Sequence, residues 1–579
     1  MITENNTSIA SASLLGMLRK HVRDHPAHGI RLMNSDTPSF LTYPDLWKAS
    51  LGYARGLHQA GIRSGDVVAI PMQPTAEVVI AIVAMFHLGC RLVPLLYRRE
   101  SRTDSPGYKA FVSALTISNA HFILVEEDDL EYYQTLVQGT ARPILPIAFP
   151  RTEGEEATEI EEWPESGAFS LVQFSSGSLA APRGIVLSRE NIYANVSSIA
   201  ERIAARPEDV CYSWLPLYHD MGLIGALFTS FYAGATLCLD APLAFISNPL
   251  SWLTKMSAFG ATITVAPQFA YNLCNKLGVL TPQQLADVNL SALRLAMNGA
   301  ENIHYASCAL FESRFAANGL RRHVIQPCYG LSENCVAVTM RVPGTPLQPV
   351  HLSRQGLAMG RADILPEPSV ETITALGNGS AVRGTEISIM TGDDIAAGEG
   401  QTGEVWIRGR STTRSILRSA AEQDEVFYPS DAWVPTGDIG FWHEGELYII
   451  GRSKEIFKKG GRTYIPNDIE TALQVIPEVG PNQVVAISTY SHERAQEELV
   501  IIVELFNNRG DLSGIEENIR RVLLSHFQLS ALEILFVRIG GLAKTSSGKL
   551  KRLQIRSMYE RKELQYLTQK ISAENDKIL

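Results

Sequence analysis

Residues 171–186 combine the small, hydroxylated and basic side chains that a phosphate-binding turn requires. The sequence there is LVQFSSGSLAAPRGIV, an apolar approach, a hydroxyl-rich turn and a second apolar run. Backbone N–H groups, hydroxyls and an arginine can converge on phosphate oxygens. A serine-rich surface hairpin is the alternative, because one short motif is a weak signal. The candidate contacts are Ser175, Ser176, Gly177, Ser178 and Arg183.

In the chain before this turn, segments with the hydrophobic pattern of a helix alternate with segments that have the pattern of a strand. This alternation predicts a parallel α/β sheet. A helix start is expected at Ser188, a polar loop over 98–107 and an acidic connector over 152–162. Helices are expected over 42–57 and 75–88, the second ended by Gly89. The predicted strands are 66–70, 92–95, 122–125, 236–239, 262–267, 294–301 and 324–333, the last three running into polar turns.

The rest of the chain predicts a second, smaller unit. Residues 345–380 show no clear period, and then come a strand over 403–408, a turn at 436–440 and a strand over 446–450. Further strands are expected over 483–487 and 499–505, with a helix over 514–523 and a charged helix at the end.

Composition excludes several classes of protein. A chain of 579 residues exceeds one hydrophobic core, so at least two domains are expected. A net charge of −10 argues against a general nucleic-acid binder. Seven scattered cysteines without a C-x-x-C pair predict reduced thiols in a cytoplasmic protein. The longest apolar run near the start, residues 78–86, is too short to span a bilayer, so no transmembrane segment is expected.

Seven short motifs occur in one order along the chain: SSGSLAAPRG, YHDMG, NGAE, YGLSE, TGD, GRSKE and TSSGK. In that order they resemble the adenylate-forming (acyl-activating) enzyme superfamily over essentially the whole length. Within it, SWLPLYHDMGLIG, PLAFISNPLSWL, PQFAYNLC and QPCYGLSE are most similar to fatty acyl-AMP ligases. Residues 345–382 stand where those ligases carry an insertion that acyl-CoA synthetases lack.

The resemblance implies an α/β fold. Residues 1–450 would form a large domain of doubly wound sheets with a β-barrel-like subdomain, and residues 451–579 a small mobile α+β domain. The implied reaction is attack of a fatty acid carboxylate on the α-phosphate of ATP, which releases pyrophosphate. Positioning and cations would carry the catalysis, since the reacting groups repel one another.

The resemblance also implies the nucleotide contacts. Glu333 would hold Mg²⁺, Asp438 would accept the ribose hydroxyls, and Arg452 would reach the ribose or the phosphates. Tyr329 would stack on adenine, and the backbone of Gly299, Ala300 and Glu301 would line the base. Alone, each has an ordinary alternative, such as a surface glutamate, a tight turn or a core tyrosine. The remaining nucleotide-site positions are Asn298, Gly330, Leu331 and Ser332.

Lys549 matches the catalytic lysine, whose ammonium would bridge the attacking carboxylate and the α-phosphate. Lys454 matches the hinge about which the small domain turns. His219 would gate or position the acyl carboxylate, with a core histidine as the alternative. The candidate acyl-channel residues are Met221, Gly222, Phe269, Ala270 and Asn298, for which ordinary core is the alternative.

The phosphate loop departs from the family pattern. Leu179 replaces a threonine, so a hydroxyl donor is lost, and Ala180 replaces a glycine, which restricts the backbone. Arg183 replaces a lysine and keeps the charge in another geometry. These changes predict slower adenylation or, as the alternative, a non-catalytic relative.

The acyl acceptor separates three hypotheses. A fatty acyl-AMP ligase would pass the acyl group to the phosphopantetheine of an acyl carrier protein, and the 345–382 segment favours it. From Arg452 onward the chain has 19 basic and 16 acidic residues, so a net charge of +3 against −13 elsewhere, which suits an acidic carrier. An acyl-CoA synthetase and a degenerate carrier-docking homologue are the alternatives.

Overall fold

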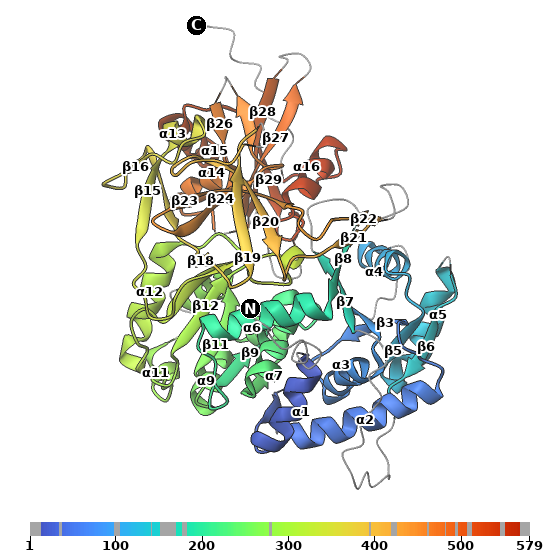
Figure 1. The fold of residues 1–579 in the computed structure, drawn as a ribbon. Helices are drawn as coiled ribbons and strands as arrows, with labels where there is room; N and C mark the ends of the chain where they lie inside the picture. The colour runs from blue at the N-terminus through green and yellow to red at the C-terminus, as the bar shows by residue number, and fades with distance from the viewer. Residues whose placement is uncertain are drawn as a thin grey trace, which may run out of the picture.

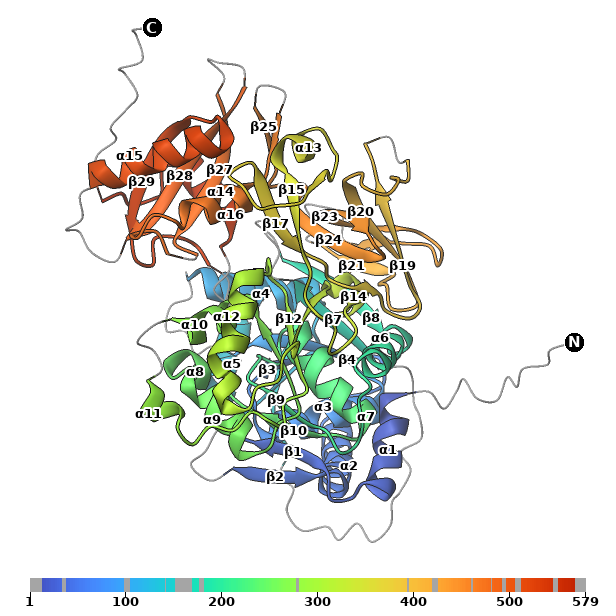
Figure 2. The same ribbon diagram turned by 90° about the vertical axis from the view of Figure 1, so that its left-hand side faces the viewer.

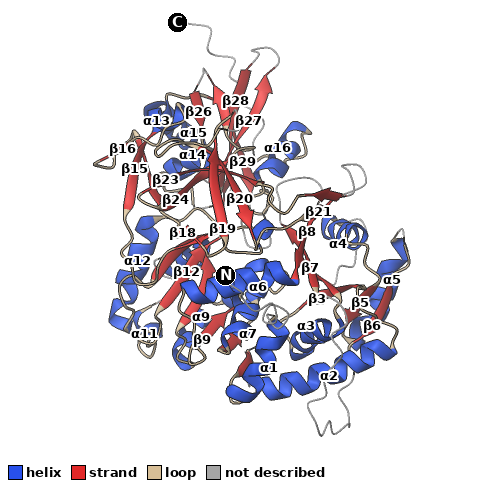
Figure 3. Ribbon diagram, viewed as in Figure 1, coloured by secondary structure: helices blue, strands red, loops and turns tan. Residues whose placement is uncertain are grey.

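Two large mixed sheets form the body of the protein, with helices between them and on their outer faces (Figure 1; Figure 3). The computed structural model describes residues 13–33, 38–97, 105–140, 142–150, 169–175, 182–276, 281–392, 395–418, 425–459, 462–480, 482–491, 496–505, 512–544 and 550–567.

The nine-stranded sheet carries a central block of six parallel strands, from β13 to β1, with antiparallel strands at both edges. Buried β-branched and aliphatic residues fill these strands, as expected for a sheet covered on both faces. In spatial order the strands are β18 (Ser380–Ala381), β14 (Thr339–Met340), β13 (Ile325–Tyr329), β12 (Leu295–Gly299), β11 (Ile263–Pro267), β9 (Val210–Ser213), β10 (Thr236–Leu239), β1 (Gly29–Leu32) and β2 (Ser39–Thr42).

The eight-stranded sheet is parallel from β7 to β6 and antiparallel at its other edge, where β7 and β8 form a hairpin. The hairpin pairs Ser175 with Arg183 at the end where the connecting segment joins the two strands. In spatial order the strands are β22 (Glu425–Phe427), β21 (Ser415–Leu417), β8 (Arg183–Ser188), β7 (Ser170–Ser175), β4 (Arg91–Leu96), β3 (Val67–Met72), β5 (Phe122–Val125) and β6 (Leu145–Ala148).

Six helices lie between the two sheets and share one apolar core with both. They are α1 (Leu14–Asp24), α2 (Tyr43–Gln59), α3 (Ala76–Leu88), α6 (Arg189–Arg202), the π-helix η3 (Met221–Phe228) and α7 (Thr229–Ala233). A second core joins the outer face of the nine-stranded sheet to α8 (Pro242–Ser247), α9 (Leu250–Ala258), α10 (Gln268–Asn275), α11 (Pro282–Leu285) and α12 (Tyr305–Phe315). A third joins the eight-stranded sheet to α4 (Pro106–Ile117) and α5 (Leu130–Leu136).

The helix boundaries follow local signals in the sequence. The Thr75 hydroxyl accepts a hydrogen bond from the Val78 N–H at the start of α3, and Gly89 ends that helix with a φ of 67°. Ser188 begins α6 in a reciprocal capping box with Asn191. The polar loop predicted over 98–107 is wrong at its end, because α4 begins at Pro106, and proline is favoured at the first position of a helix. The predicted connector 152–162 lies outside the described residues.

Two smaller sheets follow the large ones in the chain. The antiparallel sheet of four strands contains β19 (Thr385–Met390), β20 (Gly403–Gly409), β23 (Val434–His443) and β24 (Glu446–Arg452). Residues 345–382 contribute a three-stranded sheet of β16 (Ile364–Leu365), β15 (Pro349–Ser353) and β17 (Thr372–Leu376), with α13 (Arg354–Ala358). Leu352, Phe441 and Tyr448 belong to one core cluster that joins the two sheets.

The C-terminal part has cores of its own, built around a three-stranded sheet. Figure 2 shows this unit and the β15–β24 region side by side above the large sheets. Its elements are β25 (Phe457–Lys459), β26 (Arg462–Tyr464), α14 (Pro466–Leu473), β27 (Val484–Ser491), β28 (Gln496–Leu505), α15 (Leu512–Val522), the π-helix η7 (Leu523–Phe527), β29 (Ala531–Arg538) and α16 (Arg552–Glu560). The predicted α/β class, with a small α+β unit, is confirmed.

Two absences hold over the described part of the chain. No helix there is long and apolar enough to cross a membrane. All seven cysteines lie in that part, and each is a free thiol.

Candidate adenylation site

One cavity of about 490 Å³ reaches from the carboxyl ends of the parallel strands to the C-terminal unit. Open α/β sheets bind ligands at this edge. Of the predicted site residues, those on its wall are Arg183, His219, Met221, Ala300, Glu301, Tyr329, Gly330, Leu331, Ser332, Glu333, Asp438 and Arg452.

The predicted phosphate loop lies at the tip of the β7–β8 hairpin. Ser176, Gly177 and Ser178 fall outside the described residues, and so do Leu179 and Ala180. Strand pairing holds Ser175 opposite Arg183, and Arg183 Nη2 lies 3.9 Å from Glu333 Oε1. The strands on either side of the predicted loop therefore pair as a hairpin, and the phosphate-binding role of the loop stays a prediction.

The segment from Tyr329 to Ala337 holds Glu333 in a strained, buried turn. A β-carbon at Gly330 would fall 1.6 Å from the Val336 carbonyl oxygen, so only glycine permits this approach. Cys335 has φ 65° and ψ −68°, a rare γ-turn geometry for a residue with a side chain. The Thr413 N–H donates to the Glu333 carbonyl at 2.7 Å. This hydrogen bond helps to hold the backbone of the turn in its strained conformation.

Glu333 is an acid whose charge is poorly compensated by the protein. Its residue is 8% exposed, and burial raises the pKa of its carboxyl, although Arg183 opposes that rise. No cluster of three or more His, Cys, Asp or Glu side chains suited to a metal occurs in the described residues. A lone buried carboxylate fits Mg²⁺ that also binds phosphates and water.

Tyr329, at the end of β13, is connected to Asp438 and Arg452 on the adjacent strands β23 and β24. The Tyr329 hydroxyl donates to Asp438 Oδ2 at 2.7 Å, and Arg452 Nε lies 3.1 Å from Asp438 Oδ1. The β23–β24 register places Asp438 directly opposite Arg452. The predicted turn at 436–440 is wrong: these residues lie within β23, which bends at Gly437, where φ is 75°, and shifts register beside Asp438.

Asp220 is a site residue that sequence reasoning missed. Its Oδ1 lies 2.7 Å from His219 Nδ1 and accepts the Met221 N–H, and its Oδ2 accepts the Ser332 hydroxyl at 2.6 Å. Burial opposes ionisation of Asp220, but His219 and these donors keep the pKa of its carboxyl below the usual range. The signal was an acidic residue beside the predicted histidine in YHDMG.

The NGAE segment turns sharply at the end of β12. Ala300 adopts φ 68°, and Glu301 Oε2 accepts the Phe269 N–H at 2.7 Å. Asn298 is fully buried and donates to Gln268 Oε1 at 2.8 Å. These bonds fix α10 against β12. Among the described residues of the cavity wall, Asn298, Gly299, Gly222, Phe269 and Ala270 do not occur, so the structure does not bring these predicted residues into the site.

The C-terminal unit contributes a second polar group that sequence reasoning missed. Arg552 Nη2 donates to Glu470 Oε2 at 2.8 Å and to Asn467 Oδ1 at 2.6 Å, and its Nη1 pairs with Glu455. All four side chains line the cavity. Lys549 lies outside the described residues, while Leu550 and Lys551 beyond it reach the cavity. Lys454 is exposed in the turn between β24 and β25.

Comparison with known proteins identifies the class that this fold and site define. The model of the AMP-binding enzyme family matches residues 18–417, so the chain belongs to that family and acts on ATP. The resemblance to adenylate-forming ligases is thereby confirmed.

Individual relatives match over nearly the whole chain. The long-chain-fatty-acid–AMP ligase FadD28 of Mycobacterium tuberculosis is 28% identical over 88% of this chain and 90% of its own. A protein of the same organism named a fatty-acid–CoA ligase, fadD25, is 26% identical over 96% of this chain and 99% of its own. A structure from work on fatty acyl-adenylate ligases of E. coli and L. pneumophila superposes with a TM-score of 0.82 at 24% identity, covering 96% and 98% of the two chains.

Proposed function

We propose that this protein activates a fatty acid with ATP to an acyl-adenylate, releasing pyrophosphate, and then transfers the acyl group to the phosphopantetheine of an acyl carrier protein. The observation that carries the proposal is the shared cavity, which places Arg183, Glu333, Asp438 and Arg452 at one end and apolar side chains at the other. That arrangement suits an anionic nucleotide beside a lipid acid.

Each polar residue has a role in this proposal. Asp438 accepts hydrogen bonds from the ribose, Tyr329 packs against the base, and Arg452 and Arg183 contact the phosphates. Glu333 is the residue that would hold Mg²⁺, and the bound ion would neutralise phosphate charge. His219, oriented by Asp220, positions the acyl carboxylate.

The C-terminal unit completes the proposed site. We place the boundary between residues 450 and 451, with Lys454 as the hinge. The ammonium group of Lys549 would bridge the reacting carboxylate and the α-phosphate of ATP. Its neighbours Lys551 and Arg552 already face the cavity, and the Arg552 network ties this part of the chain to α14 and to Glu455 beside the hinge.

A carrier protein is the proposed acceptor because residues 345–382 fold as an added sheet beside the C-terminal unit. The charge of +3 from Arg452 onward would attract an acidic carrier. The relative fadD25, named a fatty-acid–CoA ligase, favours coenzyme A as the second candidate acceptor.

One assay tests both steps. The protein is incubated with ATP, Mg²⁺ and fatty acids of graded length, and then with coenzyme A or a holo-carrier protein. Acyl-adenylate followed by acyl-carrier product is expected. Acyl-CoA would assign the second candidate, and no adenylate with any acid would refute the proposal. Lys549→Ala should abolish pyrophosphate exchange while ATP still binds.

A further inference from the structure

The chain is held together on both sides of residues 545–549, the segment that carries the predicted catalytic lysine. Lys544 and Leu550 form an antiparallel bridge, and the Ala543 carbonyl accepts the Lys551 N–H at 2.9 Å. Ala543 and Leu550 also pack against one core of the three-stranded sheet in the C-terminal unit. Since Lys551 lines the cavity, the two sides of this segment are fixed beside the proposed site.

A single buried carboxylate, that of Glu504, organises the stem that precedes this segment, residues 540–544. Glu504 lies near the end of β28 and is 2% exposed. Its Oε1 accepts the Gly540 N–H at 2.8 Å and the Leu542 N–H at 3.4 Å, and its Oε2 pairs with the Lys544 ammonium. One side chain of the sheet thus binds three points of the stem, and hydrogen bonds to an ionised group are among the stronger ones in proteins.

The stem that follows, residues 550–552, is held by a carboxylate from another element. Arg552 pairs with Glu470 of α14. Glu470 lines the cavity, whereas neither Glu504 nor Lys544 is among the described residues of its wall. Any effect of Glu504 on a bound ligand must therefore pass through the stem that it holds.

A group that acts from a short segment depends on how firmly the ends of that segment are fixed. Positioning a reacting group in advance removes an entropic cost from the transition state, and a displacement of about 1 Å can slow a reaction about a hundredfold. A buried ion pair is a firm anchor, because separating its partners leaves a charge in a poorly solvated place. Glu504 and Lys544 therefore restrict where the chain enters the segment 545–549.

We propose that Glu504 is a positioning residue for adenylation. Through Lys544 and the backbone of residues 540–542 it holds the stem that precedes Lys549, and so places the Lys549 ammonium against the reacting carboxylate and the α-phosphate. The inference rests on the proposed function, which gives Lys549 its role. Glu504 takes no part in binding ATP, because the proposed nucleotide contacts lie within residues 175–452.

Kinetics of adenylate formation with two variants test the proposal. Glu504→Gln keeps an acceptor for the Gly540 N–H and removes the ion pair to Lys544, whereas Lys544→Met removes the ammonium. Each should lower kcat about tenfold to a hundredfold and change KM for ATP and for the acid by less than about twofold. Lys544→Arg keeps the charge and should retain most of kcat. Unchanged kcat in both Glu504→Gln and Lys544→Met would overturn the proposal.

Glu498 provides a matched control on the same strand. Glu498 and Glu504 are an even number of residues apart, so their side chains point to one face of β28. Glu498 is 1% exposed and pairs with Lys459 of β25. Glu498→Gln should lower the midpoint of thermal unfolding as Glu504→Gln does, yet leave kcat unchanged, because this ion pair is with β25 instead of a stem. An equal loss of kcat in the control would refute the positioning role.

Labelling of Lys549 gives a second readout that does not depend on turnover. In the unaltered protein, ATP and Mg²⁺ should slow the acetylation of Lys549 by an amine-reactive reagent, as measured by mass spectrometry, because the ammonium contacts the phosphates. Lys544→Met should lose most of this protection at saturating ATP. Full protection in that variant would contradict the proposal.

Adenylate formation by the unaltered protein separates a failure of this inference from a failure of the proposed function. If no acid forms an adenylate, the proposed function fails, and this inference fails with it. If adenylate forms while Glu504→Gln and Lys544→Met keep both kcat and the protection of Lys549, only this inference fails.

Discussion

At the scale of single residues, Glu333 illustrates a conflict between stability and the proposed chemistry. Burial raises the pKa of its carboxyl, so ionisation of that group costs free energy in the folded protein. The unfolded chain releases the proton more readily. The protonated carboxyl stabilises the folded protein below the pKa that Glu333 has in the unfolded chain. This stabilisation declines as the pH rises through the pKa of Glu333 in the folded protein. A bound cation would offset the cost.

Glu333→Gln should therefore separate the two properties. It should raise the midpoint of thermal unfolding at neutral pH, because no buried carboxylate must ionise. It should also lower pyrophosphate exchange about a hundredfold, since a ligand carboxylate is lost. Thermal scans at several pH values and the exchange assay measure the two effects. A lower midpoint together with normal exchange would contradict this account of Glu333.

A different prediction concerns Asp220, because its carboxylate contacts both His219 and Ser332. Asp220→Asn should lower kcat for adenylation about a hundredfold with a small change in KM for ATP, as a mispositioned His219 aligns the carboxylate poorly. Ser332→Ala removes only one of the two contacts and should have the smaller effect. Steady-state kinetics measure both variants, and equal losses would assign the effect to Ser332 instead of His219.

At the scale of elements, α3 shows how a helix is held between two sheets. Eleven of its thirteen residues are buried, and the helix is apolar on all sides. Its one buried histidine, His87, lies 3.2 Å from the Ser50 hydroxyl of α2 and packs edge-on against Trp47. Burial lowers the pKa of His87 to about 4. The α2–α3 contact therefore requires the neutral imidazole.

This burial predicts an acid-dependent loss of stability. The unfolded chain binds a proton at His87 near pH 6.5, whereas the folded protein resists it until about pH 4. The free energy of unfolding should thus have its full value above pH 6.5. It should fall by up to about 3 kcal/mol as the pH approaches 4. His87→Gln keeps a polar group and should flatten this window in denaturant titrations. An equally steep fall in the variant would assign the acid sensitivity to other groups.

At the scale of the whole molecule, the 345–382 sheet is tied to the C-terminal unit by a buried ion pair. Arg354 at the start of α13 donates to both Asp468 oxygens at 2.7 Å, and its guanidinium lies 4.7 Å from the centre of the Phe527 ring. Burial raises the pKa of Asp468, and Arg354 opposes that rise. Segments more than a hundred residues apart in sequence thus meet at this ion pair.

Arg354→Ala should destabilise the protein by about 3 kcal/mol, because it leaves the Asp468 carboxylate buried without its partner. Adding Asp468→Asn should recover part of the loss. Arg361→Ala is a matched control in the same segment, since Arg361 and Asp363 form an exposed pair and their loss should not measurably change stability. Denaturant unfolding compares the variants, and equal effects of Arg354→Ala and Arg361→Ala would contradict the assigned contact.

The sequence by itself determined the elements and the order of the motifs. The helix boundaries at Thr75, Gly89 and Ser188 depend on local capping. Strands such as β5 and β10 coincide with short apolar runs. Helix boundaries and strands of this kind could therefore be predicted without tertiary contacts. The polar end of the site was predictable for a related reason. Glu301 and Glu333 follow the ends of β12 and β13, and parallel strands bring those ends together. Asp438 and Arg452 lie instead on paired antiparallel strands, and they were predicted from their motifs.

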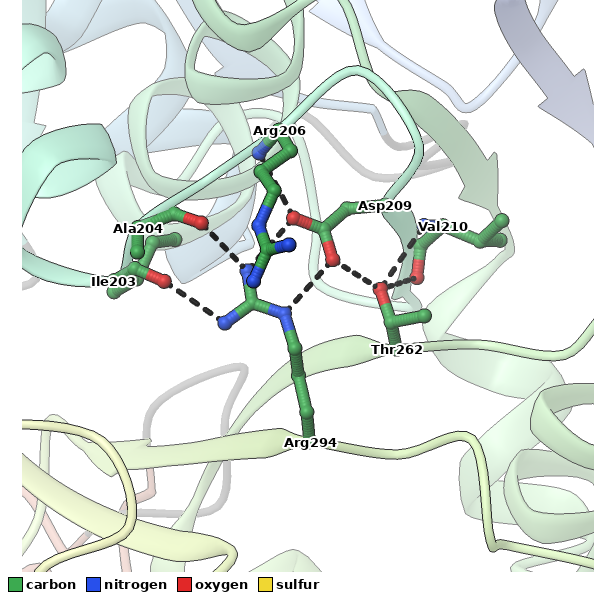
Figure 4. A network of polar contacts seen from close by, with 7 residues as sticks. All are labelled: Ile203, Ala204, Arg206, Asp209, Val210, Thr262 and Arg294. Atoms are coloured by element: carbon green, nitrogen blue, oxygen red, sulfur yellow. Dashed lines mark hydrogen bonds and ion pairs between the residues drawn. The ribbon is translucent and has the colours of Figure 1, made fainter.

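Only the tertiary structure decided where the cavity continues. Ala270 and Phe269 belong to the core on the outer face of the nine-stranded sheet, whereas the cavity wall continues along the helices of the other face, at Gly225 and Ala235. Asp209 and Arg294, in the polar network that Figure 4 shows, are 85 residues apart and meet only through strand pairing. Apolar periodicity identifies buried residues, but whether packing leaves a cavity beside them depends on how distant layers fit, which no local pattern records.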